Sequence, residues 1–238
     1  AAGEFDSLRA RRIEELKAAK DSDPSALIRV YGRRFLFGDH PYGSPASGSE
    51  RSLATVTRDD VLAYYRDNFG ADRLTLVFTG DVDARALTDA VTRAFAGWRR
   101  AAAPLPALTP APRVTGRRVL LVDQPGASQP HFWLANTGVA RKFADRAPLD
   151  VVNTLYGGRF TSILNTELRI ESGLTYGATS GFVRGSVPGE FAIRSFTKTD
   201  STGQAIDLAL ETLAGLHQKG VAADMLGTVH HGFEYTFE

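Results

Sequence analysis

A predicted helix is followed by a predicted strand within the stretch LRIESGLTYG, residues 168–177. The helix covers residues 161–171, and Gly173 predicts its end because glycine adopts the left-handed backbone that closes a helix. A strand is then predicted over residues 176–182. This close succession indicates a fold in which helices pack on a sheet.

The rest of the chain has the same mixture on both sides of this stretch. Further strands are predicted over residues 74–79, 119–122, 131–136 and 190–198. Further helices are predicted over residues 5–20, 26–35, 59–69, 83–98, 148–156 and 199–218. This order predicts the α+β class, and neither half is the regular βαβαβ series of a doubly wound nucleotide-binding sheet.

Two local features add detail to this prediction. Thr57 is expected to begin the helix over residues 59–69, because its hydroxyl can accept a hydrogen bond from a free backbone N–H. The strand over residues 190–198 is expected to be an edge strand, to which an extended peptide could add through main-chain hydrogen bonds.

The segment over residues 101–112 holds four prolines among alanine and leucine, a composition typical of a semi-rigid linker. We therefore predict a domain over residues 1–100, a linker over 101–114 and a second domain over 115–238. The first residue is not Met, and the last residues continue a structured pattern, so we expect both domains to be incomplete. Incomplete domains expose apolar surface, and we expect self-association or a neighbouring fragment to cover it.

Composition excludes several classes of protein. The 28 Lys and Arg residues balance 27 Asp and Glu residues, so the chain lacks the excess of clustered cations that binds nucleic acid. No apolar run is long enough to cross a membrane. The chain has no cysteine, which excludes disulfides and thiolate metal sites and leaves both the cytosol and the periplasm open.

The common catalytic motifs are absent from the sequence. Histidines stand only at positions 40, 131, 217, 230 and 231, so neither H-E-x-x-H nor H-x-x-E-H occurs. Gly-x-Gly-x-x-Gly, a Walker loop and Gly-x-Ser-x-Gly are absent too. His230 and His231 could hold an adventitious metal, although neighbouring side chains on a helix point in different directions.

Several segments resemble the pitrilysin/insulinase family of zinc peptidases. In the first half they are LRARRIEEL (8–16), LFGDHPYG (36–43), TRDDV (57–61) and LVFTGDV (76–82). In the second half they are LVDQPGA (121–127), YGGRFTS (156–162) and LRIESGLTYG (168–177). Their shared order and spacing across two repeats carry the resemblance, which covers nearly the whole chain.

The resemblance implies two repeated sheet-plus-helices domains of the mitochondrial-processing-peptidase-like type, which close like a clamp around a peptide. It places the zinc site in the first repeat, with an H-x-x-E-H helix upstream of residue 1. The third ligand of the family, a glutamate, matches Leu16, and the neighbouring Glu15 points to a different face. The resemblance therefore implies zinc in a partner subunit or in the upstream region, and none bound by this chain.

Some bacterial members of the family are two-subunit enzymes in which the zinc-free partner supplies an Arg and a Tyr. The matching residues here are Arg169 and Tyr176. The resemblance implies that they bind peptide substrate in a heterodimer with a zinc-bearing homologous subunit. Both side chains donate hydrogen bonds, so they can hold a substrate carbonyl and its developing oxyanion. The balanced charge and the lack of a long apolar run predict no nucleic-acid partner and no membrane span.

Simpler roles stay open for individual residues. Arg169 can be a solvated surface residue, and Tyr176 an ordinary strand aromatic. His40 is expected to shape a turn in its Pro/Gly loop. Phe132 and Trp133 are expected to be core or interface aromatics.

Two alternatives stay open for the whole chain. It can be a scaffold or binding relative that has lost proteolysis. It can also be part of a zinc-bearing peptidase whose H-x-x-E-H lies upstream of residue 1, with Glu15 as the third ligand. For the location of the protein, the resemblance to this family favours the periplasm and does not exclude the cytosol.

Overall fold

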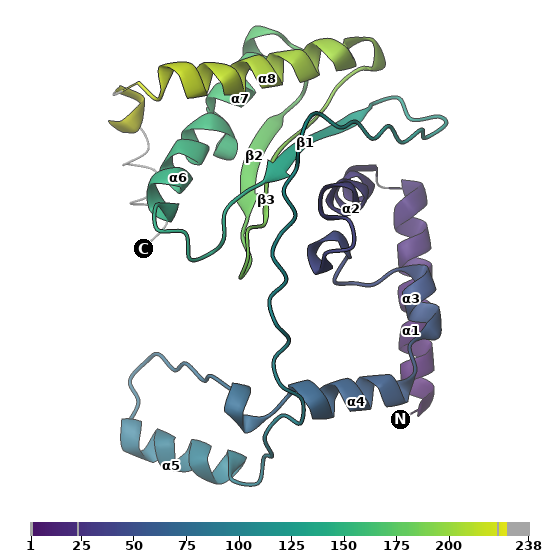
Figure 1. Cartoon of the computed structure of the whole chain (residues 1–238), viewed down its shortest axis with the longest axis vertical. Helices are drawn as coiled ribbons and strands as arrows, with labels where there is room; N and C mark the ends of the chain where they lie inside the picture. The colour runs from purple at the N-terminus through teal and green to yellow at the C-terminus, as the bar shows by residue number, and fades with distance from the viewer. Residues whose placement is uncertain (1, 23, 223, 228–238) are drawn as a thin grey trace. The chain divides into compact units, whose positions relative to one another are not determined.

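The computed structural model describes residues 2–22, 24–222 and 224–227 (Figure 1). Within these residues the chain forms helices and a small antiparallel sheet, which confirms the predicted α+β class. The chain divides into two compact units, one from residues 1–17 and 48–107, the other from residues 18–47 and 108–238. Among the helices described, none is long and apolar enough to cross a membrane.

The first unit consists of helices and connecting loops in the residues described. Its elements are the first part of α1 (Ala2–Ser22), α3 (Glu50–Thr55), α4 (Arg58–Asn68), the short 3₁₀ helix η2 (Ala71–Arg73) and α5 (Ala84–Phe95).

Three helices of this unit, α3, α4 and α5, begin at polar caps. The Thr57 hydroxyl accepts a hydrogen bond from the Asp60 N–H (3.2 Å), and the Asp60 carboxylate accepts one from the Thr57 N–H (2.8 Å). Hydrogen bonds from the Thr57 hydroxyl and N–H hold the pKa of Asp60 below its ordinary value. The reciprocal pair satisfies two N–H groups that have no partner within the helix, which confirms Thr57 as the start of α4.

The second unit contains the sheet and the helices around it. Its helices are α2 (Pro24–Phe37), η1 (Pro41–Gly43), α6 (Arg146–Asn153), η3 (Thr154–Gly158), α7 (Ile163–Asn165), η4 (Thr166–Glu171), η5 (Thr199–Ser201) and α8 (Thr202–Lys219). Its strands are β1 (His131–Thr137), β2 (Ala178–Val183) and β3 (Glu190–Phe196).

The sheet is antiparallel with the order β1-β3-β2. Arg194 of β3 lies opposite Trp133 of β1 on one side and Thr179 of β2 on the other. β3 is therefore the central strand. The prediction of an edge strand over residues 190–198 is wrong, because neighbouring strands already bond both sides of β3 and leave no backbone groups for an added peptide.

One face of the sheet packs against α8 and the segment from η3 to η4. Buried apolar residues from these helices and from all three strands form one core cluster, comprising Phe132, Tyr156, Leu164, Leu168, Ala178, Ile193, Ala205 and Ala209. The Tyr156 hydroxyl donates to the Ala209 carbonyl at 3.3 Å, and burial raises the pKa of this phenol. The expectation that Phe132 is a core aromatic is confirmed.

The opposite face packs against α2, and Figure 1 shows α2 and α8 on opposite sides of the sheet. Glu190 is only 2% exposed on this face, where Arg33 of α2 lies 3.3 Å and Arg194 3.0 Å from its carboxylate oxygens. These contacts place α2 in the same compact unit as the sheet, although α2 ends more than 90 residues before the first strand begins. The linker boundary at 101–114 stays a prediction.

The outer side of β2 lies directly against the end of α6. The Asn153 amide donates to the Ser180 carbonyl (3.3 Å) and accepts a hydrogen bond from the Ser180 hydroxyl (2.9 Å). A Cβ atom on Gly157 would lie 2.3 Å from the Ser180 hydroxyl oxygen, so this close approach requires glycine.

Two predicted strands, over residues 74–79 and 119–122, are wrong. Neither segment pairs with another strand in the part of the chain that the structure describes, and Val77, Val119 and Leu121 are exposed. A run of apolar and β-branched residues favours extended backbone, but a strand also needs hydrogen bonds from a neighbour. The sequence pattern predicts only the first of these conditions.

The packing of α2 on β1 generates a prediction. A Cβ atom on Gly32 would lie 2.5 Å from the Trp133 ring, so Gly32→Ala should lower the free energy of unfolding by about 1–3 kcal/mol through overpacking. Gly215 in α8 has nothing within 4 Å of the same added atom. Gly215→Ala should therefore raise the free energy of unfolding by about 0.5–1 kcal/mol.

Urea denaturation of the two variants measures this difference. Equal stabilities would mean that the Trp133 ring moves aside without cost and that α2 is not tightly packed on β1.

Candidate functional site

The segment that carries Arg169 is a short helix with an irregular end. Ser162 caps its first turn by accepting a hydrogen bond from the Asn165 N–H (3.3 Å). Gly173 has a φ of +62°, and the Leu174 N–H turns back to the Leu168 carbonyl (3.0 Å). This geometry confirms Gly173 as the helix stop, since glycine adopts a positive φ at little cost.

Arg169 is half-buried and lies over an aromatic ring. The central carbon of its guanidinium is 4.6 Å from the centroid of the Phe160 ring. No residue in the described ranges accepts a hydrogen bond from this guanidinium or forms an ion pair with it. Among the residues that the structure describes, its N–H donors are therefore unused.

Tyr176 stands just before β2, with a side chain that is 73% exposed. Its ring is nearly parallel to that of Phe196, with the centroids 6.4 Å apart. The chain on either side is fixed, because the Ser195 hydroxyl oxygen lies 2.9 Å from both Thr175 Oγ1 and the Gly177 carbonyl and shares its single hydrogen between these two acceptors. The phenol is thus presented from a rigid base.

The structure joins Arg169 and Tyr176 indirectly. Neither a hydrogen bond nor a ring contact links the two side chains themselves within the residues described. The Asn165 amide connects the segments that carry them: it donates to the Phe160 carbonyl (2.7 Å) and accepts from the Ala178 N–H (3.0 Å). Asn165 is 3% exposed.

The sequence reasoning missed Phe160, Asn165 and Phe196 as supports of this pair. A signal was available for Asn165, because a polar amide beside Leu164 and one turn before Leu168 stands among residues of the buried face. Such an amide needs hydrogen-bond partners. Phe160 and Phe196 carry no comparable signal, since their contacts depend on where the chain turns.

His40 has a structural role, as expected. Its Nδ1 accepts a hydrogen bond from the Tyr42 N–H (3.1 Å), which caps η1, and its Nε2 lies 3.0 Å from the Thr109 carbonyl. These two contacts assign the neutral tautomer with the proton on Nε2, which donates to that carbonyl. Both ring nitrogens are used within the fold, so His40 shapes a turn and ties it to residue 109.

The described residues do not fit a zinc site. They contain no group of three or more His, Asp or Glu side chains that could hold a metal ion. Glu15, the alternative third ligand, is half-exposed and pairs with Arg12 at 2.8 Å. Its neighbour Leu16 has no ligand atom. The histidine pair at positions 230 and 231 lies outside the described residues.

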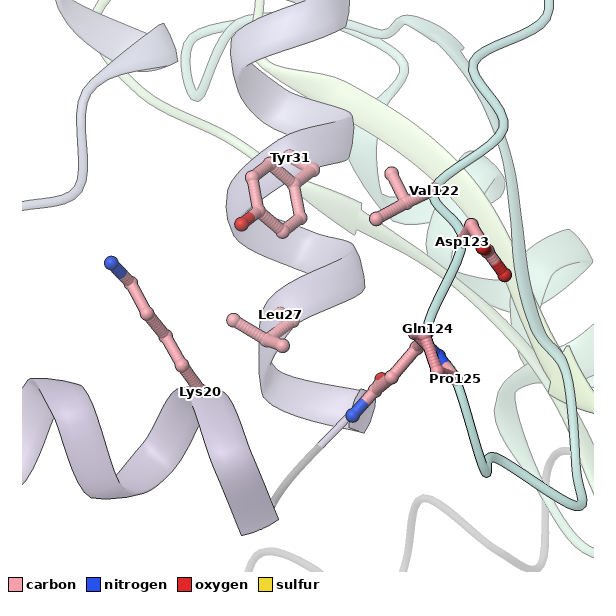
Figure 2. Close-up of a pocket in the computed structure, with 7 residues that line it drawn as sticks. All are labelled: Lys20, Leu27, Tyr31, Val122, Asp123, Gln124 and Pro125. Atoms are coloured by element: carbon pink, nitrogen blue, oxygen red, sulfur yellow. The ribbon is translucent and has the colours of Figure 1, made fainter.

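A cavity of about 380 Å³ lies apart from Arg169 and Tyr176. Figure 2 shows Leu27 and Tyr31 projecting from α2, with Lys20 on one side and Val122 on the other. Its full lining is Lys20, Leu27, Tyr31, Val122, Asp123, Gln124 and Pro125. One lysine and one aspartate without a histidine or an activated nucleophile do not form a catalytic group, so the cavity assigns no chemistry.

The helices and the small antiparallel sheet give the α+β class of peptidase domain that the resemblance implies. Comparison with known families agrees: residues 55–227 match the family described as the peptidase M16 inactive domain. The chain belongs to the peptidase M16 family, within which it matches the inactive domain.

Curated relatives and a solved structure support this membership. An uncharacterized zinc protease of Mycobacterium tuberculosis is 31% identical over 170 residues, which are 71% of this chain and 38% of that protein. An uncharacterized zinc protease of Streptomyces coelicolor is 28% identical over 90% of this chain and 48% of its own. The chain thus spans at most about half the length of these relatives.

A crystal structure of a peptidase M16 inactive domain from Pseudomonas fluorescens has the same fold. It superposes with a TM-score of 0.88 at 22% identity, over 98% of this chain and 56% of that one. This likeness confirms the fold and leaves the roles of individual residues to experiment.

The metal content of the chain is a direct prediction of this site. Since the resemblance places the third ligand at Leu16 and Glu15 pairs with Arg12, the purified chain should hold no stoichiometric zinc after dialysis. Elemental analysis measures this. One zinc per chain would overturn the assignment of the zinc site to a partner or to an upstream region.

Proposed function

We propose that this chain is the zinc-free half of a two-part peptidase and that Arg169 and Tyr176 bind its peptide substrate. One observation carries the proposal: two hydrogen-bond donors, presented from consecutive elements, find no acceptor in the part of the protein described. Polar groups of a rigid site that lack internal partners are suited to binding a ligand.

The chemistry of the two donors suits a peptide carbonyl. A phenol O–H and a guanidinium N–H both donate, and an oxygen that gains negative charge binds both more strongly. Donors held in place before the reaction stabilise such charge without reorganising. The hydrogen bonds of Asn165 and Ser195 supply this rigidity by fixing the backbone around Phe160 and Tyr176.

The other half of the enzyme is a zinc-bearing homologous subunit under this proposal. The described residues offer no metal-ligand group, and the curated relatives are named as zinc proteases. In this proposal, the role of this chain is to bind and orient the peptide. Both subunits together close the chamber that holds it.

Removal of one hydroxyl tests the role of Tyr176. Tyr176→Phe keeps the ring that lies against Phe196, so the fold should survive, while turnover by the reconstituted complex should fall roughly a hundred- to a thousandfold. Tyr64→Phe is the matched control, because Tyr64 is also exposed, at 63%, and also lies beside a phenylalanine. That variant should keep full activity.

Replacement of the guanidinium tests the role of Arg169. Arg169→Lys keeps the charge and loses the planar set of donors, so it should lower turnover nearly as much as Tyr176→Phe. Arg118→Lys is the control, since Arg118 also lies over a phenylalanine ring, at 4.9 Å. Full peptidase activity in both test variants would favour the non-proteolytic scaffold instead.

A further inference from the structure

The support beneath Arg169 differs from that of another arginine in this unit. Arg184 lies 4.9 Å from the centroid of the Phe182 ring and also pairs with Asp150 at 2.6 Å, so an acceptor holds it in place. For Arg169, the ring of Phe160 is the one side-chain partner that the described residues provide. A ring contact is made to the face of the guanidinium and leaves its edge N–H groups free.

Phe160 is suited to supporting another side chain rather than to packing in the core. Its side chain is 63% exposed, so burial of the ring does not explain its place in the fold. Its backbone is fixed, because its carbonyl accepts from the Asn165 amide at 2.7 Å and the Ser162 N–H donates to the Arg159 carbonyl at 3.1 Å. The main chain thus fixes the point from which the ring projects toward Arg169.

We propose that Phe160 is a positioning residue for Arg169: its ring fixes the plane of the guanidinium while every donor stays open to the substrate. The inference rests on the proposed function, since it gives Phe160 a purpose only if Arg169 binds peptide. It adds that an aromatic ring, and not a carboxylate, is required beneath this arginine. An ion-paired carboxylate would occupy the same donors that the substrate needs.

The test compares variants in the complex with the zinc-bearing subunit. Phe160→Leu removes the ring, Phe160→Trp restores an aromatic face, and Arg169→Ala removes the cation. kcat and KM are measured with a peptide substrate. The Kd of the same peptide is measured by fluorescence anisotropy after a chelator has removed the zinc, so that binding is read without cleavage.

Phe160→Leu should lower kcat/KM roughly two- to fivefold, the size of one cation–π contact at an exposed site, and weaken peptide binding by a similar factor. Phe160→Trp should keep both values near those of the parent. In the Arg169→Ala background, Phe160→Leu should cause no further loss, because the ring then has no cation to hold. Phe35→Leu removes the matching ring beneath Arg118 and should change neither value.

The outcomes separate the two hypotheses. If Arg169→Ala impairs binding and turnover while Phe160→Leu matches the parent, the positioning role is wrong and the proposed function stands. A Phe160→Leu loss that persists in the Arg169→Ala background also overturns the positioning role, because the ring then acts through another group. If Arg169→Ala itself has no effect, the substrate-binding role of Arg169 fails first.

Discussion

The buried amide of Asn165 holds together the segments that carry the candidate site. It bonds to the Phe160 carbonyl on one side and to the Ala178 N–H on the other, and both partners are main-chain groups of different elements. A buried backbone group left without a partner costs about 1–3 kcal/mol, so the amide fixes the turn after η3 relative to β2. This side chain therefore helps to set the positions of both Phe160 and Tyr176, which stands two residues before Ala178.

A buried ionic contact plays the corresponding part on the opposite face of the sheet. Glu190 opens β3 beneath α2, and a carboxylate so far from water is costly unless cations pair with it. Arg33 and Arg194 provide that pairing from α2 and from β3 itself. The contact explains why residues 18–47 join the later half of the chain: the charge on β3 needs a partner from α2.

Local chemistry explains which parts of the fold the sequence could predict. The start of α4 at Thr57 and the helix stop at Gly173 follow from hydrogen bonds and backbone conformation within a few residues. The three strands that form were also predicted, because the residues within each strand favour extended backbone. The central place of β3 and the unpaired state of residues 74–79 and 119–122 depend on which distant segments meet, and a local pattern contains no such information. For the candidate site, the resemblance supplied Arg169 and Tyr176, whereas their supports Phe160, Asn165 and Phe196 became apparent only in three dimensions.

The two asparagines beside β2 have a consequence for the behaviour of the protein in concentrated solution. A strand at the border of a sheet offers unpaired main-chain groups on which a second molecule can form a further strand, and this is a common route to aggregation. On β2, Asn165 occupies the N–H of Ala178 and Asn153 occupies the carbonyl of Ser180, two residues apart. A foreign strand would find these two bonding positions filled, so the side-chain amides block this part of the border and hinder a second molecule from adding a strand there.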